Sequence, residues 1–160
     1  MKLDVVAVGR LKSGPERDLV ARYAERLKGI GRALALDGPR LVELGESAAR
    51  RDLDRKAEEG SLVLAQVPDG YRLVAFDEGG ASLDSAGFAR ILGEWRDSGV
   101  PGVSFVIGGA DGLAENIRAR ASLTLAFGRM TMPHQIVRAL VLEQLYRAAT
   151  ILSGHPYHRV

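Results

Sequence analysis

The 160-residue sequence contains no cysteine. Disulfide bonds, thiolate metal sites and a cysteine nucleophile are therefore excluded. Long hydrophobic runs are missing as well, since none approaches the ~20 residues that cross a bilayer. The opening residues MKLD do not begin a secretory signal peptide. We therefore expect a cytoplasmic protein that has no membrane partner.

Several motifs of small-molecule enzymes are also absent. The stretch GGADGL, residues 108–113, is not a G-x-G-x-x-G dinucleotide fingerprint, because Ala110 and Leu113 replace two of its glycines. Neither a P-loop nor a G-x-S-x-G nucleophile elbow occurs. His155 and His158 have no acidic residue nearby that would complete a metal site. These absences argue against a nicotinamide oxidoreductase and predict no metal.

The composition indicates one globular domain over residues 1–160, with 46% hydrophobic and 26% charged residues. Charge is distributed unevenly along the chain. Residues 118–160 hold six Arg, all three His and a single acidic residue, Glu143, whereas residues 33–117 are acidic. A basic C-terminal quarter suits a polyanionic partner such as nucleic acid, although it also fits an ordinary solvated surface.

Predicted strands alternate with predicted helices along the whole chain. The helix that Ser47 is expected to cap either ends at Gly60 or continues past it, and continuation is favoured. We expect strands at 2–8, 33–44, 72–76, 103–107 and 123–127, and helices at 15–28, 47–67, 83–96, 113–120 and 133–154. This alternation predicts a single α/β domain with a mostly parallel sheet.

The last predicted helix, 133–154, carries apolar residues on more than one face. Such a wide apolar arc needs cover on two sides. One side would be the sheet of its own domain. The other would be a further layer of the same domain or a second subunit. We favour a homodimer, because two-fold dimers are the commonest assembly.

Candidate binding segments follow three of the predicted strands. They are residues 76–80 (FDEGG), 107–112 (IGGADG) and 127–134 (FGRMTMPH). In open α/β sheets, ligands bind beyond the carboxyl ends of the strands, and glycine lets backbone approach a ligand closely. Tight turns also require glycine, so each loop alone is weak support. The tail HPYHR, residues 155–159, would stack on bases and pair with phosphate, dock on a neighbouring subunit, or fray.

Four segments together resemble one known family. They are VIGGADG (106–112), MTMPH (130–134), LYRA (145–148) and the tail HPYHR, combined with the opening KLDVVAVG. Over the whole chain they are similar to the RlmH family of the SPOUT superfamily, bacterial enzymes that methylate N3 of a pseudouridine in 23S ribosomal RNA. The resemblance implies a C-terminal trefoil knot, a homodimer, S-adenosylmethionine as methyl donor, and 23S ribosomal RNA within a ribosomal particle as partner.

The resemblance also implies site residues. Candidates for catalysis are His134, Arg138, Tyr157, His158 and Arg159; donor-binding candidates are Phe76, Gly108, Phe127, Gly128, Arg129, Met130, Thr131 and Met132. Gly128 and Arg129 depart from the Leu, Ser or Phe-type residues of the family. His134 could instead cap the last helix, and Arg138 could instead pair with Glu143. The alternative function is a non-catalytic module that binds an adenosine-type ligand or RNA.

Overall fold

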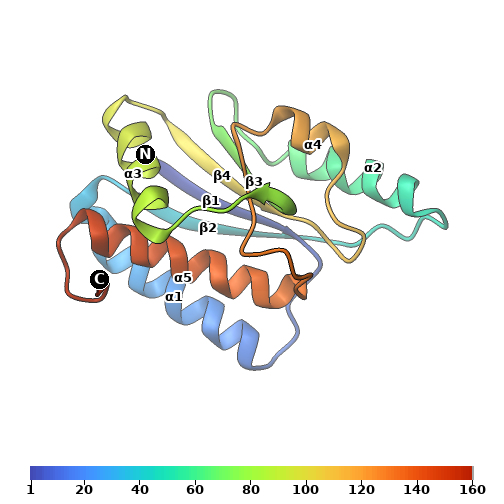
Figure 1. Ribbon diagram of the computed structural model, residues 1–160. Helices are drawn as coiled ribbons and strands as arrows, with labels where there is room; N and C mark the ends of the chain where they lie inside the picture. The colour runs from blue at the N-terminus through green and yellow to red at the C-terminus, as the bar shows by residue number, and fades with distance from the viewer. Residues whose placement is uncertain (160) are drawn as a thin grey trace.

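The computed structural model describes residues 1–159 and contains one five-stranded sheet of order β2-β1-β4-β3-β5 (Figure 1). All four strand pairings are parallel, as predicted. The strands are β1 (Lys2–Val8), β2 (Asp37–Leu44), β3 (Arg72–Ala81), β4 (Gly102–Ile107) and β5 (Leu123–Leu125). The helices are α1 (Pro15–Gly31), α2 (Asp52–Leu64), α3 (Ser85–Asp97), α4 (Glu115–Arg120) and α5 (His134–Leu152), and Arg32–Leu34 form a 3-10 turn.

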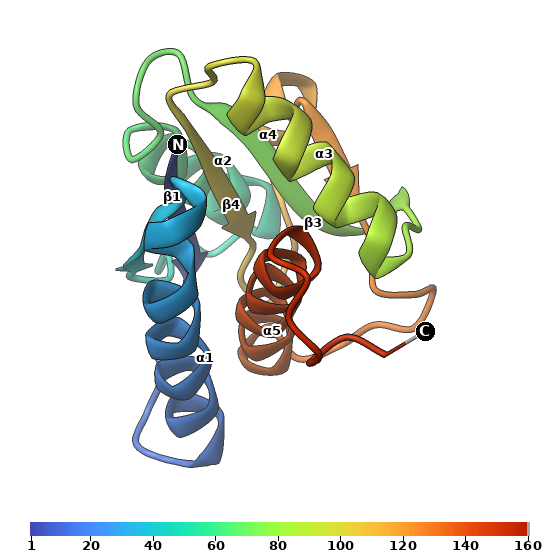
Figure 2. The ribbon, with the colours of Figure 1, turned by 90° about the vertical axis from the view of Figure 1, so that its left-hand side faces the viewer.

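Helices cover both faces of the sheet. Figures 1 and 2 show α1, α3 and α5 on one face and α2 and α4 on the other. Each central strand is buried on both faces, because successive side chains point to opposite sides. In β1, for example, Val5 joins the core under α5, whereas Val6 joins the core under α2. Continuous apolar strands of this kind are typical of parallel sheets.

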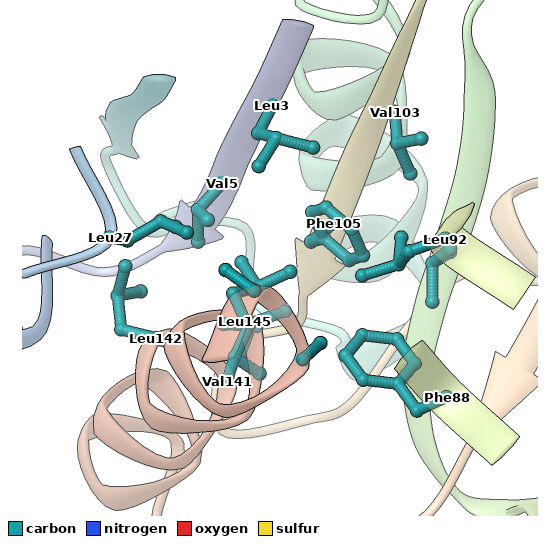
Figure 3. Close-up of a cluster of buried hydrophobic side chains, with 14 of the residues drawn as sticks. Leu3, Val5, Leu27, Phe88, Leu92, Val103, Phe105, Val141, Leu142 and Leu145 are labelled. Carbon is teal, nitrogen blue, oxygen red and sulfur yellow. The ribbon is translucent and has the colours of Figure 1, made fainter. Parts of the chain in front are cut away.

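The larger core lies between the sheet and α1, α3 and α5 (Figure 3). Phe105 of β4 is fully buried at its centre and meets Phe88 of α3 edge-on, with ring centroids 6.2 Å apart. Helix α5 supplies the opposite wall with Val141, Leu142 and Leu145, all buried. Burying each of these side chains stabilises the fold by about 1.5–3 kcal/mol before entropy is counted.

The broad apolar arc of α5 is covered within its own chain. Figure 2 shows α5 between α1 and α3, with the sheet above it. Leu142 and Leu145 are buried there, as are Ala148 and Ala149 further along. Helices α1 and α3 therefore cover most of the second side of α5. This is the alternative in which a further layer of the same domain, and not a second subunit, covers the helix.

Helix α2 differs from its prediction at both ends, since it ends at Leu64 instead of residue 67, but it confirms the expected continuation past Gly60. The helix begins at Asp52, and Ser47 does not cap it. The Ser47 hydroxyl instead accepts a hydrogen bond from Ala49 N–H, 3.1 Å away, inside the preceding loop. The helix continues past Gly60, as favoured. A β-carbon on Gly60 would lie 2.8 Å from Cβ of Ala114, so glycine is needed there for the approach to the segment before α4.

Several strand boundaries also differ from prediction. Residues 32–34 form a 3-10 turn, so the second strand begins only at Asp37. β3 extends to Ala81 instead of ending at residue 76, and β5 ends at Leu125 instead of residue 127. The extension has a local cause, because Ala126 N–H donates to the Ala81 carbonyl at 2.9 Å and pairs the two strands again beyond Phe76.

No helix within residues 1–159 is both long enough and apolar enough to cross a membrane.

We predict that Gly80→Ala destabilises the protein. A β-carbon at Gly80 would lie 2.5 Å from the backbone carbonyl carbon of Leu125, which cannot move without shifting β5. Overpacking of this kind costs about 1–3 kcal/mol, measured as a lower free energy of unfolding in urea. Gly29→Ala is the matched control: nothing lies within 4 Å of the added carbon, and alanine favours a helix by up to ~1 kcal/mol. Equal stability of the two variants would contradict the prediction.

Candidate functional site

The three glycine-containing loops converge on one cavity at the carboxyl edge of the sheet. Its volume is about 730 Å³, and all three loops line it. The convergence follows from strand register, because the pairing of β3 with β4 ends at Phe76 opposite Ile107, so residues 77–80 and the loop after β4 start side by side. A cavity of roughly 300–1,000 Å³ suits a small organic molecule.

Seven of the eight predicted donor-binding residues line this cavity: Phe76, Gly108, Phe127, Gly128, Met130, Thr131 and Met132. Arg129 is exposed and is not among the lining residues. Gly108 is needed for the shape of its loop. A β-carbon there would lie 2.8 Å from the carbonyl carbon of Gly112, across a turn closed by the 3.1 Å hydrogen bond from Gly112 N–H to the Gly109 carbonyl.

Two phenylalanines form an apolar wall of the cavity. The rings of Phe76 and Phe127 are stacked, with centroids 5.2 Å apart and planes 9° from parallel. Phe76 comes from β3 and Phe127 from the segment after β5, so the contact also holds the two loops together. Leu125 and Ile107 complete this apolar part of the lining. A flat apolar surface beside exposed glycine backbone can hold a planar ring.

Polar contacts hold residues 77–80, in the last part of β3, at the cavity. Arg118 of α4 donates to Asp77 Oδ2 from Nη2 at 2.8 Å and from Nε at 3.0 Å. Burial acts against the charged carboxylate, but the Gly79 N–H and the Arg118 guanidinium together lower the pKa of Asp77. Glu78 accepts a hydrogen bond from the Thr131 hydroxyl at 2.9 Å, which links this loop to the segment before α5.

The glycine loop 108–112 is held by α2. Arg55 contacts both oxygens of Asp111, at 2.6 and 3.0 Å, and the bond to Arg55 lowers the pKa of that carboxyl. The next residue, Lys56, lines the cavity, as does Arg118. Sequence reasoning missed Lys56 and Arg118. In the sequence, a charged residue on a predicted helix cannot be told from one on a solvent-exposed face. Only the packing of α2 and α4 brings Lys56 and Arg118 to the cavity.

His134 lies in the wall of the cavity at the first turn of α5. Its Nε2 is so close to Gly9 that a β-carbon on Gly9 would lie 3.1 Å from it. The side chain makes no capping hydrogen bond at the helix start. Burial, and then the charge of Arg138, lower the pKa of His134, while Glu46 and Glu59 oppose them. The imidazole is therefore neutral at neutral pH.

Arg138 does not line the cavity and is almost fully buried, with 3% of its surface exposed. Its guanidinium donates to Glu43 at 2.7 Å and to the carbonyls of Val8 and Gly9 at 3.0 Å each. The expected alternative partner, Glu143, binds Arg147 instead. Arg138 is thus placed to position α5 against the ends of β1 and β2, not to touch a bound molecule.

The C-terminal tail packs on its own α5 and α1, away from the cavity lining. The Tyr157 hydroxyl donates to Glu143 at 3.1 Å and lies 3.5 Å from the Tyr23 hydroxyl. Burial and these two neighbours raise the pKa of Tyr157. Nδ1 of His158 is 3.4 Å from Arg147. Tyr157, His158 and Arg159 therefore lie outside the cavity of the chain that carries them.

Across the described residues, no three His, Asp or Glu side chains gather in a way that would hold a metal ion. The titratable groups that line the cavity are three carboxylates, two cations and one imidazole. This arrangement suits an organic ligand that is held by backbone, apolar and ionic contacts.

Residues 1–158 match a family described as "Predicted SPOUT methyltransferase". Ribosomal RNA large subunit methyltransferase H of Rhodopseudomonas palustris (strain BisB18) is 57% identical over 99% of both chains. The protein of that name from Methylobacterium sp. (strain 4-46) is also 57% identical, over 99% of this chain and 98% of its own. A probable methylase family protein from Haemophilus influenzae Rd KW20 has a similar fold, with a TM-score of 0.52, 13% identity, and coverage of 99% of this chain and 70% of that one.

The fold and these relatives define a methyltransferase of the SPOUT class. Within this class, the chain belongs to the ribosomal RNA large subunit methyltransferase H family, which confirms the resemblance seen in the sequence.

We predict that Glu46→Gln lowers the pKa of His134 further, because the Glu46 carboxylate favours the imidazolium form. The pKa is measured by following the imidazole NMR signals with pH. Because the pKa is already below the value of about 6.5 for an unfolded chain, stability is lost as pH falls below 6.5, and this variant should lose more. Glu25→Gln, on the exposed face of α1, is the control, and an unchanged or higher pKa in Glu46→Gln would refute the prediction.

Proposed function

We propose that this enzyme transfers a methyl group from S-adenosylmethionine to N3 of a pseudouridine in 23S ribosomal RNA. The observation that carries the proposal is the convergence of the three loops on one cavity, in a chain 57% identical to proteins named for methylation of large-subunit ribosomal RNA. A ribosomal particle is the proposed form of the substrate.

The cavity lining fits the donor in three ways. Glycine backbone at 108–112 and the stacked rings of Phe76 and Phe127 suit an adenosyl group. Asp77 and Asp111 keep ionised carboxylates at the cavity, since their pKa values are lowered. Each carboxylate is paired with an arginine, but its remaining acceptor sites would accept hydrogen bonds from the ammonium group of the ligand. When bound, S-adenosylmethionine supplies the electrophilic methyl group of the reaction.

The nucleotide must lose the N3 proton, because the imide nitrogen attacks through the electron pair that this proton occupies. His134 is the proposed acceptor of that proton. Its neutral imidazole lies in the cavity wall, and a neutral imidazole nitrogen is able to accept a proton. The remaining requirement is to align the nitrogen with the methyl group, which is an effect of positioning.

The tail is proposed to contact RNA at the cavity of a second subunit. Tyr157, His158 and Arg159 combine an aromatic ring, an imidazole and a guanidinium, which stack on bases and pair with phosphate. They do not line the cavity of their own chain. A contribution to catalysis by these residues therefore requires a homodimer. In this proposal, the backbone of the cavity loops binds the donor and the side chains of the tail bind the RNA.

A trefoil knot around the donor loops is also part of the proposal. The family match supports it. The segments that would form the knot are residues 77–81, which pack against Leu125, and the residues after Leu125, which lead into the cavity wall before α5. The three loops would then be held by the knot as well as by their ionic contacts.

The function is tested with S-adenosylmethionine labelled in its methyl group and ribosomal particles that lack this modification. We expect label at N3 of one pseudouridine. We predict that Gly108→Val, which forces the 108–112 turn open, weakens donor binding in calorimetry by at least about tenfold and abolishes labelling.

Gly45→Val is the matched control, because a β-carbon there meets nothing within 4 Å. Donor binding without any transfer to RNA would replace the proposed enzyme with an adenosine-binding module. Unchanged affinity in Gly108→Val would remove the 108–112 loop from the donor site.

We predict that the protein sediments as a homodimer of about twice its 17.2 kDa chain mass. Met130 and Ile136, which flank the start of α5, are 81% and 44% exposed, and such large apolar side chains are candidates for a subunit interface. Analytical ultracentrifugation at micromolar concentration measures the mass directly. A single monomeric species would overturn both the dimer and the proposed role of the tail.

A further inference from the structure

Two basic side chains are exposed on the loop between β1 and α1. Arg10 and Lys12 are exposed, whereas Leu11 between them is 92% buried in the larger core (8% exposed). The buried leucine anchors the loop, so its two neighbours are presented to solvent. Within residues 1–159 neither Arg10 nor Lys12 is part of an ion pair, in contrast to the arginines that hold the cavity loops.

A network of hydrogen bonds fixes the conformation of this loop. The Leu11 N–H donates to Glu43 Oε1 at 3.0 Å, and the same oxygen accepts from Arg138 at 2.7 Å. Arg138 also binds the carbonyls of Val8 and Gly9, and the Gly9 N–H donates to Leu44 at 2.8 Å. The loop is therefore ordered before any partner binds, which lowers the entropic cost of binding.

The loop lies at the rim of the cavity. Gly9 packs against His134, which lines the cavity wall. β1 also lies beside β4 in the sheet, with Ala7 opposite Ile107, so the loop after β1 starts next to the loop that begins at Gly108. Arg10 and Lys12 are thus adjacent to the side of the cavity where the target base is proposed to lose its proton.

We propose that Arg10 and Lys12 bind backbone phosphates of the ribosomal RNA next to the target nucleotide. The Glu43–Arg138 ion pair would position these two side chains by holding the loop that carries them. The inference rests on the proposed function and adds to it a second RNA-contacting element, separate from the tail. Phosphate contacts set the register of a nucleic acid without reading its bases. Contacts beside His134 would therefore set which nucleotide enters the cavity.

The test compares Arg10→Ala/Lys12→Ala with Lys2→Ala/Arg72→Ala. The control pair also removes one Lys and one Arg, both exposed, but they lie at the amino edge of the sheet. We expect the first variant to raise KM for ribosomal particles about tenfold and to leave kcat and the donor Kd within twofold of wild type. Its plot of log affinity against log salt should be less steep by about 1.4, which corresponds to two lost single-strand phosphate contacts.

Equal effects of the two double variants, or an unchanged KM and salt slope in Arg10→Ala/Lys12→Ala, would overturn the proposal. RNA binding is also measured directly, by titrating a fluorescent fragment of 23S ribosomal RNA without donor. If the wild type binds RNA but transfers no methyl group, the proposed function fails while the loop is still tested by this titration. If the wild type does not bind the RNA or the particles at all, both proposals fail.

Glu43→Gln tests the positioning role. The amide oxygen can still accept from Leu11 N–H, but the charge that pairs with Arg138 is lost. We expect a higher KM, and no additional rise in KM when Glu43→Gln is combined with Arg10→Ala/Lys12→Ala, because its effect on KM acts through those two side chains. Additive effects on KM would show a merely structural role and would overturn this part of the proposal.

Discussion

The guanidinium of Arg138 joins the first turns of α5 to the carboxyl ends of β1 and β2. Its bonds to the carbonyls of Val8 and Gly9 satisfy acceptors at the point where β1 leaves the sheet, and its bond to Glu43 balances its charge. A buried charge without such partners is strongly destabilising. This one contact sets the position of His134, the course of the loop after β1 and one wall of the cavity. The buried Arg138 guanidinium and its partners thus shape the carboxyl edge of the sheet into one wall of the cavity.

The cavity combines two kinds of contact, each with a different physical role. Gly108 lets its turn close where a side chain would meet the backbone of Gly112, Gly112 itself adopts a positive φ of 83°, and the stacked Phe76 and Phe127 supply an apolar surface. Ion pairs hold the loops from outside, so the bound molecule does not have to order them. The cationic side chains outside the cavity, Arg10 and Lys12 at its rim and Arg159 on the tail, suit a large polyanion. In the proposed function, the small donor and the large RNA are therefore bound by separate groups.

Much of the fold could be predicted from local pattern. Continuous apolar runs such as 103–107 predicted buried parallel strands, and the three glycine loops after them predicted where a ligand would bind. The tertiary structure decided the details that depend on packing. Ser47 bonds within its loop instead of capping α2, and Gly60 sits inside a helix because the residues before α4 press against it. Neither the hydrogen bonding of Ser47 nor the place of Gly60 within a helix can be predicted without knowing which segments pack beside them.

The residues of the site also divide into those that local pattern predicted and those that only tertiary packing placed. Strand period and glycine spacing by themselves predicted the α/β class and the three binding segments, because these signals are local in the chain. The sequence motifs, the tail among them, indicated the family, and the resemblance implied the seven predicted residues that line the cavity. Only the tertiary structure brought Lys56 and Arg118 to the cavity, turned Arg138 away from it and folded Tyr157 onto Glu143. These placements depend on contacts between residues far apart in sequence. For Arg138, the decisive partner is Glu43, which no helical spacing could have indicated.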